Sequence, residues 1–256
     1  MIRAVLFDLD DTLLDLNLSA FIVRYVAGAS SLLARACRTS AAAFALPYAR
    51  SFLALEAPGR DDDLTNRQVF CDVFRRESGV PLDDPVIADM IGCYECTVVP
   101  GLSGGLVRAR PQRGARACLD AVRDEGLACA LATNPTFSLA ADEARLAWAG
   151  LSSDDFDDVS TLDDCTRCKP CARYYREFAA RLGLDLRECL MVGNDPSRDL
   201  ARPASCGLRT AYVGHGRPPA GAVWHGSVER LATELHDLVA RLDEQDGRDS
   251  GRGHEA

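Results

Sequence analysis

Short apolar runs alternate with amphipathic segments along much of the chain, and this alternation predicts its secondary structure. The apolar runs are too short for helices and too continuous for half-exposed strands, so they predict buried strands. They lie at residues 3–7, 127–132, 156–160, 189–192 and 210–213. The segments between them carry apolar residues three and four positions apart and predict helices over residues 114–125, 137–149 and 170–182. Strands that alternate with helices predict an α/β fold, in which helices cover both faces of a parallel sheet.

Residues 16–104 follow a different pattern. Their apolar residues recur at three- and four-residue spacing, which predicts helices alone. Breaks at Pro47, 58–59, 79–81 and 100–101 divide this segment into about four helices. We therefore expect an α/β core, a smaller helical domain and a polar, disordered tail. Their ranges are residues 1–15 with 105–243 for the core, 16–104 for the helical domain and 244–256 for the tail.

The composition narrows the classes of function. The 256 residues are 47% hydrophobic and 26% charged, as in ordinary soluble proteins. The formal net charge of −9 gives no electrostatic reason to bind nucleic acid or an anionic membrane surface. The chain begins without the basic and apolar regions of a signal peptide, and we expect no apolar run of the roughly 20 residues that span a bilayer. These features predict a cytoplasmic protein that binds neither nucleic acid nor membrane.

The eleven cysteines allow two interpretations. Cys165, Cys168 and Cys171 are spaced like thiolate ligands of zinc or of an iron–sulfur cluster, and Cys93 and Cys96 form a second pair. Cysteine also serves as a small apolar core residue, and a chain of this length needs no disulfide scaffold. We favour the core interpretation, because such spacings specify a metal site only loosely.

The first predicted strand ends in two carboxylates. Asp8 and Asp10 are two residues apart, so their side chains point to the same side of an extended chain, and Thr12 follows at the same spacing. Two carboxylates at one site repel each other, which raises one pKa unless a cation lies between them. The pair therefore predicts either a proton-sharing dyad or a hard metal ion with oxygen ligands.

Polar residues also follow two other predicted strands. Thr133 and Asn134 follow one of them, and Asn194, Asp195 and Asp199 follow another. The carboxyl ends of parallel strands meet at one edge of the sheet, where sheets of this class bind their ligands. The sequence therefore predicts a single polar site at that edge.

Together with Lys169, which opens a predicted helix, these residues form four motifs in order along the chain. The motifs are Asp8-Leu9-Asp10-Asp11-Thr12, Thr133-Asn134, Lys169-Pro170 and Gly193-Asn194-Asp195-Pro196-Ser197-Arg198-Asp199. In order, spacing and placement they resemble the motifs of the haloacid dehalogenase-like (HAD) hydrolase superfamily. The resemblance covers residues 1–15 and about 105–240. It implies a Rossmann-like core, and it implies that the helical domain is a cap that closes over a small substrate.

The resemblance also implies roles in phosphoryl transfer. Asp8 would be the nucleophile that forms an aspartyl-phosphate, and Asp10 would protonate the leaving oxygen and then deprotonate the attacking water. Lys169 would neutralise charge on Asp8 and on the phosphoryl group. The residues that would bind the substrate or orient its loop are Thr12, Thr133 and Asn134.

One Mg²⁺ is implied in the same way. Asp8, the backbone carbonyl of Asp10, and Asp195 would hold it, while Asp199 and Asn194 would support these ligands from behind. The commonest fourth motif places an acid directly after the glycine, where this chain has Asn194. We assign the metal to Asp195, because its spacing from Asp199 matches the family and a carboxylate binds Mg²⁺ better than an amide does.

The resemblance thus implies a Mg²⁺-dependent phosphatase for a small phosphorylated metabolite. A phosphomutase is the nearest alternative, since the same intermediate on Asp8 can pass its phosphoryl group to a second hydroxyl. Haloacid dehalogenation is less favoured, because members with that activity lack an acid at the position of Asp10 and need no Mg²⁺. A non-catalytic regulatory protein that binds metal through thiolates is a further alternative, and the complete motif set argues against it.

Overall fold

A computed structural model describes residues 1–252 of the chain, with side chains for residues 1–248. Its centre is a six-stranded sheet in the order β5-β4-β1-β6-β7-β8, in which every neighbouring pair is parallel. The strands are β1 (Ala4–Phe7), β4 (Ala128–Leu131), β5 (Asp158–Val159), β6 (Cys189–Gly193), β7 (Arg209–Val213) and β8 (Trp224–Gly226). The predicted α/β class with a Rossmann-like parallel sheet is confirmed.

Both faces of the sheet are buried, but they hold side chains of different size. On β1, Val5 and Phe7 face one core cluster, while Ala4 and Leu6 face the other, as the two-residue period of a strand requires. The second cluster also contains Ala130 of β4 together with the aromatic residues of α7 (Ala172–Arg181). The alanines leave room for the large rings of the helix, while Leu6 and Met191 fill the rest of this side.

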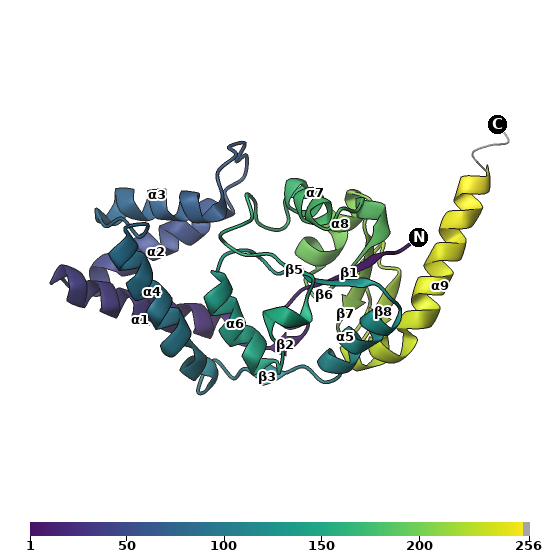
Figure 1. Cartoon of the computed structure of the whole chain (residues 1–256), viewed down its shortest axis with the longest axis horizontal. Coiled ribbons are helices and arrows are strands. Elements are labelled where there is room, and N and C mark those ends of the chain that lie inside the picture. The colour runs from purple at the N-terminus through teal and green to yellow at the C-terminus, as the bar shows by residue number, and fades with distance from the viewer. Residues whose placement is uncertain (253–256) are drawn as a thin grey trace.

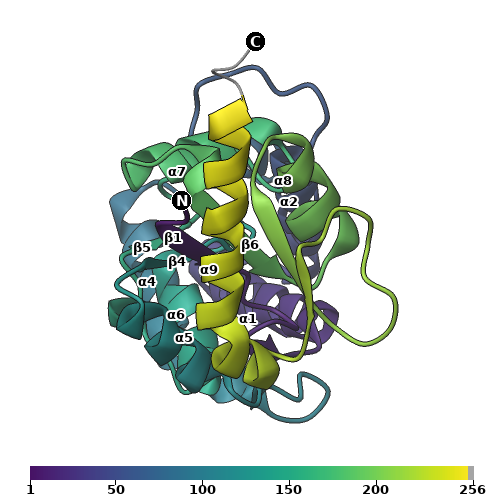
Figure 2. The same cartoon turned by 90° about the vertical axis from the view of Figure 1, so that its right-hand side faces the viewer.

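The remaining helices of the core complete the layers on either side of the sheet (Figures 1 and 2). They are α5 (Ala115–Asp124), α6 (Leu139–Trp148), α8 (Arg202–Ser205) and α9 (Val228–Arg252). Apolar residues of α5 and α9 join the first core cluster, opposite the side covered by α7. Figure 2 shows α9 lying lengthwise in front of the sheet.

Four helices are inserted between β1 and β4 and form the left-hand part of Figure 1. They are α1 (Leu18–Cys37), α2 (Ala42–Leu55), α3 (Asn66–Ser78) and α4 (Pro85–Thr97). Local signals fix their ends: Asn17 caps α1, Thr65 forms a capping box with Gln68, and Asp84 caps α4. We call these four helices and the loops that join them the insertion.

The break predicted at Pro47 is wrong, because this proline lies inside α2 and is buried there. The chain instead breaks at Arg38, which adopts a left-handed conformation with φ of 54° after α1. Packing of the apolar face of α2 outweighs the backbone hydrogen bond that a proline removes.

The expectation that no segment could span a membrane is wrong for α1. This helix is long enough and apolar enough to cross a membrane, by length and composition only. In the structure one of its faces is buried against the core. Phe21 and Tyr25 pack against Phe137, with ring centroids 5.3 and 5.4 Å from that of Phe137. Core helices of soluble proteins can match membrane-spanning helices in length and composition.

The expected disordered tail is wrong for residues 244–252, where α9 continues to Arg252, while residues 253–256 lie outside the described residues. Polar contacts over a long sequence distance hold this end of the helix. The Ile2 N–H donates to Asp243 at 2.6 Å, and the amino group of Met1 lies 2.8 Å from Asp246. The sequence of this segment gives no sign of these contacts, because their partners lie at the other end of the chain.

Several short elements were not predicted. These are β8, α8, a two-stranded ribbon of β2 (Leu14–Asp15) and β3 (Arg110–Pro111), the 3₁₀ turns Val99–Ser103, Ser153–Asp155 and Leu186–Glu188, and the π-helical turn Pro196–Ala201. Such elements carry too few residues for a periodic signal. The amphipathic α9 was also missed, although its buried leucines at 231, 235, 238 and 242 follow a helical period.

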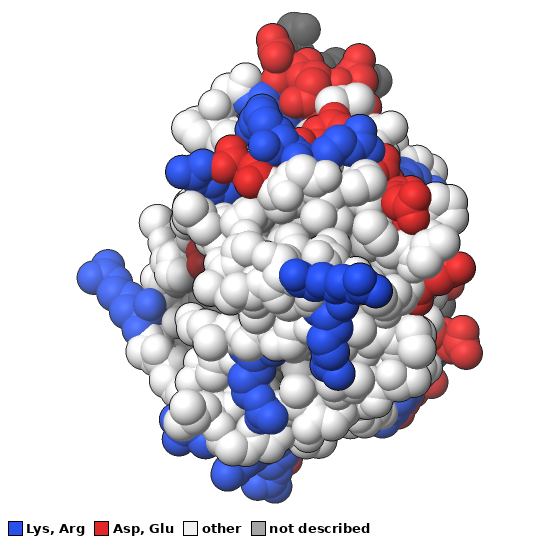
Figure 3. Space-filling view, turned by 90° about the vertical axis from the view of Figure 1, so that its left-hand side faces the viewer, with Lys and Arg blue, Asp and Glu red and all other residues white. Residues whose placement is uncertain are grey.

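Figure 3 views the molecule from the end of the insertion. On the face shown, Lys and Arg side chains are scattered, and Asp and Glu gather toward its upper edge. This face therefore has no continuous basic surface of the kind that binds nucleic acid. The expected absence of nucleic-acid and membrane partners stays a prediction.

The contact between α5 and α9 leads to a test of the fold. A Cβ at Gly114, which has a φ of +84°, would lie 2.3 Å from Cα of Glu229. We expect Gly114→Ala to lower the free energy of unfolding by about 1–2 kcal/mol for the left-handed backbone and by about 1–3 kcal/mol more for overpacking. Urea unfolding would measure this loss. Gly126→Ala is the matched control, because Gly126 also has a positive φ, +69°, but open space around it; equal losses for the two variants would refute the steric part.

Candidate active site

The predicted site residues converge at the carboxyl ends of the three central strands. Asp8 follows β1, and its neighbours in the sheet lead into Thr133 after β4 and Asn194 after β6. The backbone fixes this edge, because the Asp8 N–H donates to the Val192 carbonyl at 2.9 Å. A cavity of about 150 Å³ opens here. It is lined by Asp8, Asp10, Asp11, Leu18, Thr133, Asn134, Lys169, Asn194, Asp195, Arg198 and Asp199.

Lys169 joins two of the carboxylates. Its Nζ donates to Asp8 Oδ1 at 2.8 Å and to Asp199 Oδ1 at 2.7 Å, and its side chain is only 1% exposed. Burial alone lowers the pKa of Lys169, but the carboxylates of Asp199 and Asp8 outweigh this effect and the pKa is raised. The lysine is therefore a fixed ammonium ion beside the predicted nucleophile.

Burial has the opposite consequence for the two acids. Removal from water raises the pKa of Asp8, and it raises the pKa of Asp199 to about 6, although Lys169 pulls both downward. Asp199 is also held from behind, since its Oδ2 accepts the Asp195 N–H at 3.0 Å. The turn of residues 196–201 thus presents Asp199 to the lysine rather than to solvent.

Gly193 makes this close approach possible. A Cβ at this position would lie 2.4 Å from Cγ of Asp199, closer than any real contact of this kind. The last residue of β6 must therefore lack a side chain for Asp199 to reach Lys169. The close approach of Asp199 is therefore the physical reason for the glycine at the start of the fourth motif.

Asp10 lies in a second buried ion pair. Its Oδ2 accepts a hydrogen bond from Arg145 Nη1 at 2.6 Å, and Arg145 Nη2 donates to Asp142 Oδ1 at 2.6 Å. Arg145 is 1% exposed, and its guanidinium lies 5.0 Å from the ring centroid of Phe137 and 5.9 Å from that of Phe21. Burial raises the pKa of Asp10, and it raises the pKa of Asp142 to about 6. The positive charge of Arg145 lowers both pKa values but does not offset the effect of burial.

The remaining predicted residues have distinct partners. The Thr12 hydroxyl lies 3.5 Å from Asp8 Oδ2 and 3.4 Å from Asn194 Oδ1. Asn134 Oδ1 accepts the backbone N–H of Lys169 at 3.1 Å, which ties the second motif to the third. Thr133 is buried, and its carbonyl accepts hydrogen bonds from Ser160 and Tyr174.

The lining of this site offers oxygen donors for a hard divalent cation. Among the described residues no three His, Cys, Asp and Glu side chains are arranged as metal ligands, and the predicted Mg²⁺ ligands are instead two carboxylates and one backbone carbonyl. Asp8 and Asp199 are buried and Asp10 is half-buried in this lining, and Asp142 is buried behind it; among the described residues their cationic partners are Lys169 and Arg145. One oxygen of Asp10 is buried without a hydrogen-bond partner among the described residues. The surplus of negative charge and oxygen atoms is the donor chemistry that Mg²⁺ requires.

Asp195 contributes only part of its carboxylate to this lining. Its Oδ1 accepts the backbone N–H groups of Ser197 and Arg198, both at 2.8 Å, and so caps the following turn. Asn194 also lines the cavity and carries an amide oxygen. The assignment of the metal to Asp195 rather than Asn194 stays a prediction.

The thiolate interpretation receives no support. Among residues 1–248, no group of three or more His, Cys, Asp and Glu side chains is arranged to hold a metal ion. Cys168 Sγ accepts a hydrogen bond from Asn66, and burial raises the pKa of Cys165 to about 12, which disfavours the thiolate. Cys165 and Cys168 are buried in the core and Cys171 is half-buried, and the absence of a metal from this cluster stays a prediction.

Three site residues were missed from the sequence. Arg145 and Asp142 lie three residues apart on the buried face of α6. An acidic and a basic residue at this spacing, among apolar positions of a predicted helix, was the sequence feature that could have indicated them. Glu56, at the end of α2, accepts hydrogen bonds from Asn134 Nδ2 at 2.8 Å and from Arg198 Nη2 at 2.9 Å. Nothing near Glu56 in the sequence indicates these partners.

A family model for haloacid dehalogenase-like hydrolases matches residues 2–207, which is most of the chain. The protein belongs to this hydrolase family. Comparison with curated protein sequences finds no match. Membership shows that the motif resemblance is genuine, and it supports an enzyme that catalyses hydrolysis.

Solved structures of HAD proteins share the fold. The HAD phosphatase from Thermococcus onnurineus is 21% identical, with a TM-score of 0.55 over 93% of this chain and 98% of that chain. The 2-haloacid dehalogenase from Pseudomonas syringae pv. Tomato DC3000 is 20% identical, with a TM-score of 0.59 over 94% and 99%. The L-2-haloacid dehalogenase from Xanthobacter autotrophicus is 20% identical, with a TM-score of 0.52 over 92% and 99%. These neighbours include a phosphatase and dehalogenases, so the shared fold does not distinguish the two reactions.

The ion pairs of Arg145 allow a direct test of the site's stability. We expect Arg145→Met to lower the free energy of unfolding by about 3–5 kcal/mol, because it leaves two buried carboxylates without their cation. Urea unfolding would measure this change. Arg116→Met is the control, since Arg116 pairs with Asp155 at the surface and should cost at most about 1 kcal/mol. A loss no larger than that of the control would show that Arg145 does not compensate these charges.

Proposed function

We propose that this protein is a Mg²⁺-dependent phosphatase that hydrolyses a small phosphorylated metabolite through an aspartyl-phosphate on Asp8. The observation that carries the proposal is the placement of Asp8 and Asp10 in two different ion pairs. Asp8 is paired with Lys169, and Asp10 is paired with Arg145. Two carboxylates in different environments can perform different tasks in one reaction.

In the first step an oxygen of Asp8 attacks phosphorus, and the bond from phosphorus to the leaving oxygen breaks. Asp10 donates a proton to that oxygen, so the leaving group departs as a neutral hydroxyl. In the second step water attacks the phosphorus of the aspartyl-phosphate while Asp10 takes its proton. Inorganic phosphate leaves, and both carboxyl groups return to their starting states.

The other residues supply binding and charge. The ammonium of Lys169 would stabilise negative charge on the phosphoryl oxygens, and we expect Thr133 and Asn134, which line the same cavity, to bind these oxygens. Asp8, the carbonyl of Asp10, and Asp195 would hold Mg²⁺. When bound, this ion would neutralise the phosphoryl group and the surplus of buried carboxylates.

The acid at position 10 distinguishes this proposal from dehalogenation. Dehalogenating members of the family lack an acid there, and a halide leaving group needs no proton. A buried carboxylate at this position, held by a buried arginine, has a use where the leaving atom is oxygen. We therefore favour the phosphatase over the dehalogenase.

The insertion would act as a cap in this reaction. Its residue Glu56 already contacts the second and fourth motifs at the mouth of the site. A cover of this kind excludes water from the reacting groups. The cytoplasm remains our predicted compartment, and all eleven cysteines are free in the structure, as a reducing environment favours.

The first experiment is hydrolysis of para-nitrophenyl phosphate with and without Mg²⁺. We expect turnover that needs Mg²⁺ and falls below detection in Asp8→Asn, because the amide is not a nucleophile. Asp154→Asn, at an exposed aspartate far along the chain, should keep wild-type activity. Turnover that survives Asp8→Asn would refute the aspartyl-phosphate route, and release of halide from a 2-haloacid by wild-type protein would favour the dehalogenase.

The role of Asp10 gives a separate prediction. Asp10→Asn should lower kcat by about 10²–10⁴-fold for an alkyl phosphate, because the amide cannot protonate the leaving oxygen. The loss should be smaller for para-nitrophenyl phosphate, whose leaving group is stable as an anion. Steady-state kinetics on both esters would measure the two losses, and equal losses would argue against proton donation by Asp10.

A further inference from the structure

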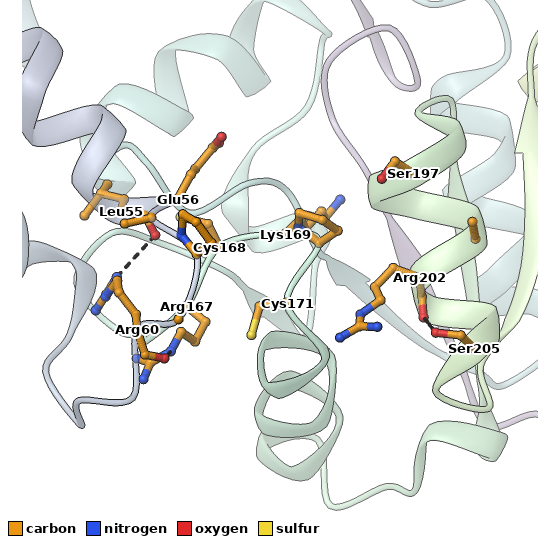
Figure 4. Close-up of a pocket in the computed structure, with 15 residues that line it drawn as sticks. Leu55, Glu56, Arg60, Arg167, Cys168, Lys169, Cys171, Ser197, Arg202 and Ser205 are labelled. Carbon is orange, nitrogen blue, oxygen red and sulfur yellow. Dashed lines mark hydrogen bonds between the residues drawn. The ribbon is translucent and has the colours of Figure 1, made fainter.

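A second, larger cavity adjoins the proposed phosphoryl site. Its volume is about 710 Å³, within the range of small-molecule sites, and Lys169 lines both cavities. Its walls come from the end of α2 and the loop that follows, from residues 167–171, and from the segment 197–205 (Figure 4). The cavity therefore lies between the insertion and the core, next to the reacting groups.

The walls of this cavity are cationic, although the protein as a whole is acidic. Arg60, Arg167 and Arg202 line it, and among the described residues Glu56 is the one acidic residue in the lining. Arg60 and Arg167 are already engaged, since both bond to Asp62 and to backbone carbonyls. Neither guanidinium is free to bind a ligand without giving up these bonds.

Arg202 is different. It is exposed, and among the described side chains it has no ion-pair partner. Figure 4 shows it projecting from the wall formed by the segment 197–205 into the opening, on the side opposite Arg60 and Arg167. An unpaired guanidinium aimed into a cavity is a binding group for a carboxylate or a phosphate.

Glu56 stands where the two cavities meet. Its carboxylate receives one hydrogen bond from Asn134 Nδ2 at 2.8 Å and one from Arg198 Nη2 at 2.9 Å. Glu56 lines the large cavity, while Asn134 and Arg198 line the small one. This bridge therefore separates the two spaces and occupies donors that an anionic ligand could use.

We propose that the large cavity receives the leaving group of the substrate, that this group carries a negative charge bound by Arg202, and that Glu56 gates its entry. The inference rests on the proposed function and narrows its substrate to a phosphate monoester with an anionic leaving group. An arriving anion repels the Glu56 carboxylate and competes with it for Arg198. The phosphoryl group of every substrate competes with Glu56 in this way, and only an anionic leaving group adds a second repulsion from the large cavity, which favours opening of the passage that Glu56 closes.

Binding of two non-hydrolysable probes tests the inference. The probes are 4-carboxyphenylphosphonate and phenylphosphonate, which differ by one negative charge at the end that would enter the large cavity. Isothermal titration calorimetry on wild-type protein with MgCl₂ should show about three- to tenfold tighter binding of the carboxylated probe. Arg202→Gln should abolish this preference, and Arg202→Lys should keep part of it, because it retains the charge.

Two further variants complete the design. Glu56→Gln should tighten binding of the carboxylated probe about threefold or more, because the repelling charge is gone. Arg187→Gln is the matched control, since Arg187 is exposed and lies outside the lining of both cavities. Its preference for the carboxylated probe should equal that of wild-type protein.

Equal affinities of wild-type protein for the two probes, binding of neither, or a preference unchanged by Arg202→Gln would each overturn the inference. Binding of the phosphonates does not depend on catalysis, so these outcomes leave the hydrolysis of para-nitrophenyl phosphate as an independent result. A preference that depends on Arg202 in a protein without phosphatase activity would support the anion site and refute the proposed reaction.

Discussion

The ammonium group of Lys169 is the contact on which the rest of the site depends. It is buried between Asp8 and Asp199, which come from different strand ends, and each lies within 2.8 Å of it. The cation opposes the rise in pKa that burial causes in both carboxyl groups, and the two carboxylates raise the pKa of the lysine against the effect of its burial. The sheet topology, the glycine at position 193 and the turn that carries Asp199 all serve to bring these three groups together.

A second buried cation connects this site to the insertion. Arg145 binds Asp10 while its guanidinium packs against Phe21 of α1 and Phe137 of the core. The side chain therefore touches both parts of the protein at the point where the chain passes from one to the other. A shift of α1 relative to the sheet would change the surroundings of Asp10 through this one residue.

The sequence predicted those parts of the structure whose signals are local. Apolar runs located the central strands, and the polar residues that follow them converge as expected, because parallel strands end at one edge. Arg145 and Glu56 escaped prediction because their partners are remote: 135 residues separate Arg145 from Asp10, and 142 separate Glu56 from Arg198. The helix break predicted at Pro47 was wrong because the packing of α2 outweighs the local preference of proline to end a helix.

The unequal filling of the two faces of the sheet has a consequence for reactivity. Ala4 and Ala130 leave space for Tyr174 and Phe178, and this space sets how near α7 lies to the strands. Lys169 stands just before α7, so a change in the volume of Ala4 or Ala130 would move the backbone that carries the ammonium group bound to Asp8. Evolution or engineering could therefore change the surroundings of Asp8 by adding or removing a methyl group beneath α7, at positions outside the lining of the cavity.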